Sequence, residues 1–157
     1  MLGIRRREFL TLLGGSAAAL TFERFSARAQ QPAMPVVGYI FTGSPETETD
    51  NVAAFRDGLK EMGFADGRNV AIEFRWANNE LGRVPELAAD LVPRRVTVIA
   101  AFAMVSALAA KASTATIPIV FSSGGEPVQA GLVASLNRPG GNVTGSNFMS
   151  VELTDGT

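Results

Sequence analysis

The sequence predicts an α/β fold, a Rossmann-like parallel sheet with helices on both faces. Apolar runs of strand length alternate with segments of helical periodicity in the order β-α-β-α-β-α-β-α, which is the order of a doubly wound parallel sheet. Several of these runs have no polar face, as expected of strands that are covered on both sides. Small, polar or glycine-rich residues follow the strands, at the edge where open α/β sheets bind ligands. We therefore expect a small-molecule site at that edge.

Four strands and the beginning of a fifth are expected. Most are continuous apolar runs, whereas the second alternates apolar residues (Val70, Ile72 and Phe74) with charged ones, as a half-exposed strand near the sheet edge does. Pro118 has no N–H and fits the first positions of the fourth strand. The expected ranges are 36–41, 70–75, 96–101 and 117–121, with 142–145 beginning a further strand or crossover.

The first expected helix begins near Thr49 or Asp50, because either side chain can cap it. Gly63 ends this helix, and Phe64 is expected to fold back on the last turn in a Schellman motif. Apolar residues at helical spacing predict one buried face. They are Val52, Phe55, Leu59 and Met62.

Three further helices are expected at about 82–92, at 105–112 and after Pro127. Proline suits the first turn of a helix, and Glu126 beside it is favourable for the helix dipole. This last helix is expected to break before a Pro-Gly-Gly segment. Its inward-facing residues are predicted to be Val128, Leu132, Val133 and Leu136.

Cysteine and histidine are both absent from the 157 residues. Without cysteine there is no disulfide, thiolate nucleophile, iron–sulfur site or lipidated cysteine. Without histidine, a Ser-His-Asp arrangement and the commonest metal ligand are excluded. We therefore expect no enzyme, no cofactor and no metal, with a catalyst that uses carboxylates alone as the remaining alternative.

Charge is spread unevenly along the chain, whose formal net charge is −1. Residues 1–29 hold five arginines and two glutamates, so the rest of the chain is net acidic. Nucleic-acid-binding proteins present a basic patch or stripe, and we expect no nucleic-acid partner. No G-x-G-x-x-G motif follows the first strand, and no G-x-x-x-x-G-K-[ST] motif occurs.

Residues 1–29 have the three parts of an export signal. An arginine-rich start precedes an apolar run at 10–22, and Ala27 and Ala29 occupy the −3 and −1 positions of a cut after Ala29. The run is shorter than the roughly 20 residues that span a bilayer, and an amphipathic or membrane helix is the alternative. We expect a periplasmic protein that begins near Gln30 with a linker at 30–35.

The start of the signal also has the form of a twin-arginine motif, which directs the export of proteins that are already folded. The motif is Arg6-Arg7-Glu8-Phe9-Leu10, with Arg6, Arg7, Phe9 and Leu10 as its signal residues. General export remains the alternative, because arginine pairs also occur in ordinary signals.

Several candidate sites can be interpreted either as functional or as purely structural. Ser122-Ser123-Gly124-Gly125 either offers N–H groups to an anion at a helix N-terminus or is an ordinary βα turn. The acidic residues of 46–50 are better explained as a solvated first helix turn than as a cation site. Trp76 and Phe102 either stack on an apolar ligand or pack against the domain itself.

Several segments resemble those of one protein family. The most specific is 131–145, GLVASLNRPGGNVTG. The others are the signal motif with Leu13-Gly14-Gly15, and the segments 54–61, 69–76, 117–121 and 125–128. On these segments the chain resembles the ABC-transporter substrate-binding proteins of the type 1 periplasmic-binding fold, in the branch that includes tryptophan- and tyrosine-type binders.

The resemblance implies a protein of two α/β lobes, of which this chain would be the export signal and most of the first lobe. Residues 36–149 would form this N-terminal lobe, and 150–157 a truncated crossover toward a missing second lobe. One lobe alone is expected to bind a ligand weakly or not at all, because good sites bury most of a ligand's surface.

The resemblance also implies the solute-binding component of an ABC importer. Its ligand, a small molecule such as an amino acid or an aromatic acid, would lie between two lobes that close like a hinge. The protein, a monomer, would deliver it to a permease in the inner membrane. Hydroxyls and loop N–H groups would hold a ligand carboxylate, and Trp76 or Phe102 would pack on its apolar part. The candidate ligand-binding residues are Thr42, Ser44, Trp76, Phe102, Ala103, Ser122, Ser123 and Glu126.

Other functions make different demands on the sequence. A periplasmic ligand-sensing lobe for a signalling partner is the alternative function, because fold alone does not separate sensing from transport. An enzyme would need paired carboxylates across the strand-end cleft, and the sequence places only Glu126 there, where family members usually have Asp. A transcriptional regulator would need a basic helix-turn-helix at the position that the export signal occupies.

Overall fold

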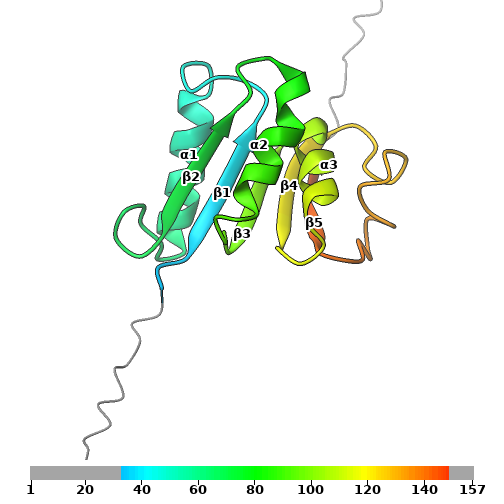
Figure 1. The fold of residues 1–157 in the computed structure, drawn as a ribbon. Coiled ribbons are helices and arrows are strands. Elements are labelled where there is room, and N and C mark those ends of the chain that lie inside the picture. Colours follow the sequence, from blue (N-terminus) through cyan, green and yellow to red (C-terminus); the bar gives the residue numbers. More distant parts are fainter. Residues whose placement is uncertain (1–32, 149–157) are drawn as a thin grey trace, which may run out of the picture. The chain divides into compact units, whose positions relative to one another are not determined.

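The computed structural model describes residues 33–148 of the chain. The predicted export signal at 1–29 and the predicted crossover at 150–157 lie outside the described residues. The described part contains a five-stranded parallel sheet of order β2-β1-β3-β4-β5 (Figure 1). Its elements are β1 (Val36–Phe41), α1 (Thr49–Glu61), β2 (Ala71–Trp76), η1 (Leu81–Arg83), α2 (Val84–Leu91), β3 (Val98–Phe102), α3 (Met104–Ser113), β4 (Ile119–Gly124) and β5 (Val143–Phe148).

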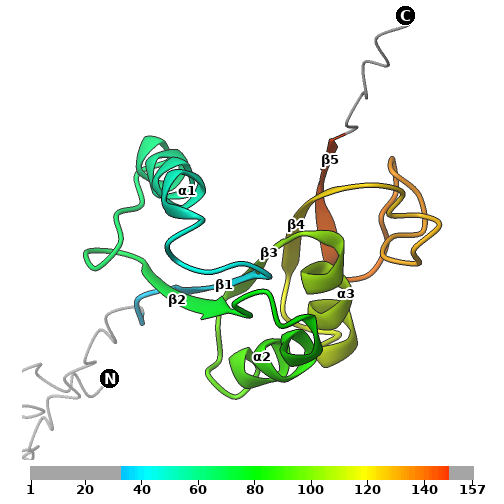
Figure 2. The same ribbon diagram turned by 90° about the horizontal axis from the view of Figure 1, so that it is seen from above.

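Helices lie on both faces of the sheet. Helix α1 lies on one face, and α2 and α3 lie next to each other on the other face (Figure 2). This arrangement confirms the predicted α/β fold with a parallel sheet between helices. The strand β2 is an edge strand, as its alternation of apolar and charged residues predicted.

The main core lies between the sheet and the pair α2 and α3. Strands β1 and β4 contribute Ile40 and Ile119, and α2 contributes Leu91, all with no exposed surface. A smaller core on the other face includes Val37 of β1, and Phe55 of α1 packs against it. Since successive strand residues point to opposite faces, the central strands β1 and β3 supply residues to both cores.

Helix α1 ends with the predicted Schellman motif. Gly63, at φ +86°, donates its N–H to the carbonyl of Lys60, and Phe64 donates to the carbonyl of Leu59. Met62 was predicted to lie on the buried face, and this prediction is wrong. Its residue surface is 78% exposed, because the helix ends one residue earlier and the chain turns away.

Helix α1 begins at Thr49, as predicted, but the predicted side-chain cap is absent. Glu48 is the N-cap residue, and no side chain caps the helix, so neither Thr49 nor Asp50 plays the predicted role. The Thr49 hydroxyl donates instead to the carbonyl oxygens of Pro45 and Glu46, which precede it in the chain.

Strand β4 is longer than predicted. Ser122, Ser123 and Gly124 were expected to form a loop, but they continue the strand because they pair with the last three residues of β5. The strand expected at 142–145 is present as β5. It closes one edge of the described sheet.

The helix expected after Pro127 is absent from the described structure, and turns take its place. One helical bond forms, from the N–H of Ala130 to the carbonyl of Glu126. Gly131 then adopts φ +72°, a left-handed conformation that ends the turn. Lys111 of α3 donates to the carbonyl oxygens of Gly131 and Leu132, which make no helical bond.

Candidate functional site

The eight predicted site residues all lie at or just beyond the carboxyl ends of strands. Thr42 and Ser44 follow β1, Trp76 ends β2, and the other five belong to the ends of β3 and β4 or to the segments after them. Because the strands are parallel and paired in register, these ends meet at one edge of the sheet. The structure therefore brings the candidates to one edge and does not scatter them.

A cavity of about 640 Å³ opens at this edge, beneath the first half of α1. Strands β1, β3, β4 and β5 and the start of α3 form its other walls. It contains three of the predicted residues, Phe102, Ala103 and Ser122. The residues that line it are Tyr39, Phe41, Glu48, Asn51, Ala54, Phe55, Phe102, Ala103, Met104, Ser122, Gly124 and Phe148.

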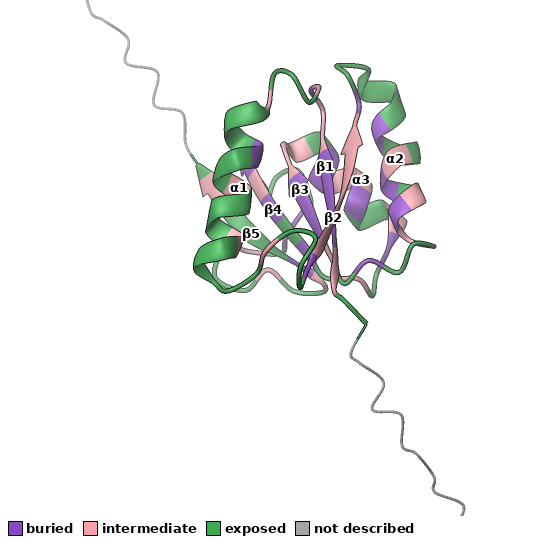
Figure 3. Cartoon of the chain, turned by 90° about the vertical axis from the view of Figure 1, so that its left-hand side faces the viewer, coloured by how far each residue is buried: buried purple, intermediate pink, exposed green. Residues whose placement is uncertain are grey.

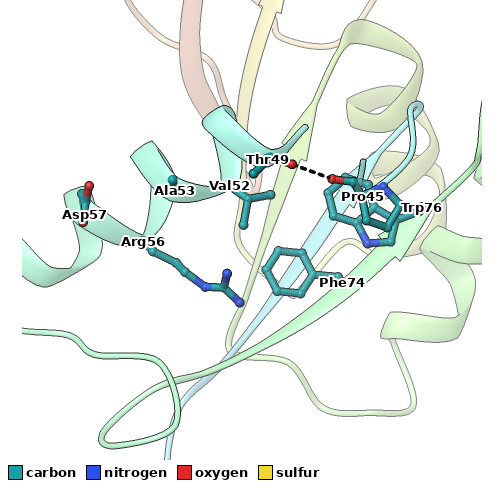
Figure 4. A pocket seen from close by; sticks show the side chains of 8 residues that line it. All are labelled: Pro45, Thr49, Val52, Ala53, Arg56, Asp57, Phe74 and Trp76. Atoms are coloured by element: carbon teal, nitrogen blue, oxygen red, sulfur yellow. Dashed lines mark hydrogen bonds between the residues drawn. The ribbon is translucent and has the colours of Figure 1, made fainter. Parts of the chain in front are cut away.

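Trp76 lines a different pocket, a groove of about 540 Å³ between α1 and the edge strand β2. Figure 4 shows Phe74 between the indole of Trp76 and the guanidinium of Arg56. The two rings are parallel within 5°, with centroids 5.6 Å apart. The Arg56 guanidinium carbon lies 5.2 Å from the centroid of Phe74. Trp76 therefore packs against the domain itself, which was one of its two predicted readings.

Ser122 and Ser123 point to opposite faces of the sheet, because they are successive strand residues. Ser122 lines the cavity, and its Oγ lies 3.5 Å from the Oγ of Ser146 on β5. Ser123 is fully buried, and its Oγ has no hydrogen-bond partner among the described residues. Only one of the two predicted hydroxyls is thus available to a ligand in the cavity.

The remaining predicted residues lie outside the cavity. Ser44 belongs to a turn in which its N–H bonds to the hydroxyl of Thr47 and its carbonyl accepts from the same hydroxyl. A hydrogen bond from Ser44 holds the pKa of Glu46 below its usual value. Thr42 and Glu126 do not line the cavity either, and Glu126 is exposed.

The start of α3 gives the cavity a group that can hold an anion. Ala103 is the N-cap of this helix, and Ala103 and Met104 both line the cavity. The first N–H groups of a helix have no partner within it, and the helix dipole favours negative charge there. Ala103 has φ +71°, an uncommon conformation for a non-glycine residue, and its N–H donates to the carbonyl of Ser122 at 3.1 Å.

Sequence reasoning missed Tyr39, which lies at the centre of the site. Its ring packs against four other aromatic rings, with centroids 4.6 Å away for Phe102 and 5.5 Å away for Trp76. Burial raises the pKa of its hydroxyl to about 12, and the negative charge of Glu48 adds to the rise. A tyrosine inside an otherwise apolar strand was the signal that could have identified it.

The acidic residues of 46–50 separate in the structure. Glu48 lines the cavity, whereas Glu46 and Asp50 are exposed. Asn51 donates from its side-chain amide to Glu48 Oε2 at 2.7 Å. Within residues 33–148 no group of three or more acidic side chains is placed to hold a metal ion. In the same part of the chain, every helix is too short or too polar to span a membrane.

Comparison with known proteins gives one family. Residues 44–155 match the family "ABC transporter substrate binding protein". A curated relative, the tyrosine-binding protein of Clostridioides difficile strain R20291, is 39% identical over 101 residues. That match covers 64% of this chain and 29% of the relative, so the chain spans under a third of the relative's length.

Solved structures share the fold. A conserved domain protein from Vibrio cholerae O1 biovar El Tor matches with a TM-score of 0.70 and 30% identity, over 75% of this chain and 40% of that one. The ABC domain from Streptococcus pneumonia in complex with L-Trp matches with a TM-score of 0.66 and 26% identity, over 72% of this chain and 38% of that one. The resemblance noted in the sequence is thereby confirmed. This chain belongs to the ABC transporter substrate-binding protein family, whose members bind substrates and are not enzymes.

Proposed function

We propose that this chain is the first lobe of a periplasmic solute receptor for an ABC importer. The receptor captures a small molecule, such as an amino acid or an aromatic acid, between two lobes and delivers it to a permease in the inner membrane. The observation that carries the proposal is the cavity at the carboxyl edge of the sheet, in a chain that matches this family over most of its length. The names of two relatives, one that binds tyrosine and one in complex with L-Trp, support an aromatic amino acid as the ligand.

The walls of the cavity suit such a ligand. Phe102 and Phe55 stand edge to face with centroids 5.8 Å apart, and Phe148 lines the same space. Aromatic walls pack well against an aromatic side chain. The Ser122 hydroxyl and the first N–H groups of α3 lie at the same cavity and would hold a carboxylate.

Closure on the ligand requires a second lobe. The solved relatives are more than twice as long as the part that this chain matches, and the second lobe would correspond to their remaining part. The first lobe supplies half of the enclosure, and hinge closure supplies the rest. The family is extracytoplasmic, and the predicted export signal at 1–29, with Ala27 and Ala29 at its end, fits delivery to the periplasm.

The test is a ligand screen on the protein with both lobes. Amino acids and aromatic acids are added one at a time, and the melting temperature is measured; the ligand is expected to raise it. A screen in which none of these compounds raises the melting temperature would overturn the proposal.

A matched pair of variants then locates the site. Ser122→Ala removes a hydroxyl from the cavity and is expected to weaken binding roughly 2- to 10-fold, the worth of one hydrogen bond. Ser123→Ala, one residue along on the opposite face, is expected to leave the affinity unchanged. Calorimetric titration measures both, and equal affinities for the two variants would place the ligand elsewhere.

A further inference from the structure

The charge of the cavity restricts the ligand more closely than the family does. Among its lining residues Glu48 is the only charged side chain, and neither lysine nor arginine lines the cavity. The positive end of α3 is the feature that attracts an anion. The cavity therefore has one acidic corner, at the start of α1, and one anion-attracting corner, at the start of α3.

Tyr39 adds a second polar group to the acidic corner, beside the carboxylate of Glu48. Its residue surface is only 1% exposed, yet it lines the cavity. Two side-chain hydrogen bonds involve the residues that line the cavity, Asn51 to Glu48 and Ser146 to Ser122, and neither includes the Tyr39 hydroxyl. Glu48 lies close enough to act electrostatically on that hydroxyl. A hydroxyl of a cavity-lining residue that makes no bond to the protein is available to a ligand.

The position of the Glu48 carboxylate is also fixed. Its backbone carbonyl accepts from the N–H of Val52 at 2.9 Å, and its side chain accepts from the amide of Asn51 at 2.7 Å. The Asn51 amide uses one lone pair of one oxygen, and a carboxylate has about four such acceptor sites. Most of the acceptor capacity of Glu48 therefore remains for a donor that enters the cavity.

We propose that Glu48 and the Tyr39 hydroxyl bind the ammonium group of the ligand. The ligand is a primary amine with an aromatic body, which lies against Phe102 and Phe55. Glu48 accepts a charge-assisted hydrogen bond from the ammonium, and the hydroxyl of Tyr39 accepts a second. This inference rests on the proposed function and sharpens it, because an aromatic acid without an amine would have no group to pair with Glu48 at the acidic corner.

Three related compounds test the amine contact. L-Tyrosine carries both an ammonium and a carboxylate, tyramine lacks the carboxylate, and 3-(4-hydroxyphenyl)propionate lacks the ammonium. Each is titrated into the ¹⁵N-labelled protein with both lobes, and the backbone amide shifts of cavity residues Ala54, Ala103 and Gly124 are followed. The two amines are expected to bind at least 10-fold more tightly than the compound without an amine.

Glu48→Gln is the deciding variant, because glutamine has nearly the same shape and can still accept from Asn51. It is expected to weaken the binding of tyrosine and tyramine at least 10-fold. Any weakening of the binding of 3-(4-hydroxyphenyl)propionate is expected to be less than 3-fold. Glu46→Gln is the matched control, since it removes the same charge two residues away from an exposed side chain outside the cavity. It is expected to preserve the preference for amines.

The outcomes separate this inference from the proposed function. Binding of all three compounds without preference, or an unchanged preference in Glu48→Gln, overturns the amine contact and leaves the receptor proposal standing. A preference lost equally in Glu46→Gln shows long-range charge and not contact, and also overturns it. Absence of cavity shifts with all three compounds overturns the inference, and the ligand screen on the two-lobed protein then decides the proposed function independently.

Discussion

Tyr39 organises the α1 face of the sheet at the scale of single residues. Its ring lies within 5.5 Å, between centroids, of the rings of Phe55, Phe74, Trp76 and Phe102. These rings come from α1, β2 and β3, so one side chain of β1 joins three other elements. The same residue lines the cavity at the carboxyl edge of the sheet. Tyr39 therefore belongs both to this aromatic cluster and to the wall of the cavity.

The ionisation of Tyr39 gives a clean prediction, because it is the single tyrosine of the chain. Its pKa is raised to about 12 in the folded protein, first by burial and then by the charge of Glu48. Unfolded tyrosine titrates near 10. Its contribution to stability is therefore complete below pH 10, and is lost as the pH rises from 10 through 12.

Absorbance of tyrosinate near 295 nm measures this titration directly. The folded protein is expected to show a midpoint near 12, and the denatured protein a midpoint near 10. Glu48→Gln should lower the folded midpoint because it removes the second cause, whereas Tyr39→Phe should remove the signal altogether. A folded midpoint near 10 would show that the hydroxyl is freely hydrated.

The residue-scale site was only partly predictable. The order of strands and helices indicated which edge of the sheet would hold the candidates, and Phe102 and Ser122 line the cavity at that edge. Ser122 and Ser123 point to opposite faces of the sheet because β4 extends through both residues, and the sequence did not predict that the strand continues so far. Tyr39 was missed because it lies inside β1, two residues before the strand ends, whereas the candidates were sought at and after strand ends.

At the scale of elements, the two ends of helix α1 are stabilised differently. Its start has no side-chain cap, whereas its end has both bonds of a Schellman motif around Gly63. Figure 3 shows that most of the helix surface is exposed. Residue Gly58 lies inside the helix, and a Cβ added there would meet nothing within 4 Å. Gly63 is needed for its positive φ at the end of the helix, whereas no close contact requires a glycine at position 58.

Substitution of these two glycines by alanine is expected to have opposite effects. Gly58→Ala should stabilise the protein by about 0.4–1 kcal/mol, because alanine loses less backbone entropy in a helix. Gly63→Ala should destabilise it by roughly 1–2 kcal/mol, because alanine is strained at φ +86°. Urea unfolding monitored by circular dichroism measures both. Equal shifts of the midpoint in one direction would contradict the assignment of the helix end.

The segment after Pro127 shows why one element could not be predicted. Apolar residues at helical spacing indicated a helix with four inward-facing residues. Leu132 and Val133 are buried, 1% and 5% exposed, but the prediction is wrong for Val128 and Leu136, which are 42% and 65% exposed. Burial here does not need a helix, because Lys111 of α3 binds the carbonyls of Gly131 and Leu132 directly. A contact between distant parts of the chain overrode the local pattern, and periodicity alone does not register such a contact.

The two faces of the sheet differ at the scale of the whole described lobe. Helices α2 and α3 cover one face and form the main core with it. On the other face α1 covers only part of the sheet, and an apolar hollow of about 410 Å³ lies beside it. Val37, Val98 and Val120 are among the residues that line this hollow. The parallel topology was predictable from the alternation of strands and helices, whereas this asymmetry was not, since it depends on where α1 packs.

Neighbouring residues of β4 allow a direct test of this asymmetry. Ile119 has no exposed surface and faces α2 and α3, whereas Val120 is 46% exposed on the other face. Ile119→Thr is expected to cost about 2–4 kcal/mol, because it removes buried apolar volume and buries a hydroxyl without a partner. Val120→Thr keeps the β-branched shape and is expected to change stability by about 0.5 kcal/mol or less. Denaturant unfolding of both variants measures the difference, and equal losses would show that in solution the second face is as closely covered as the first.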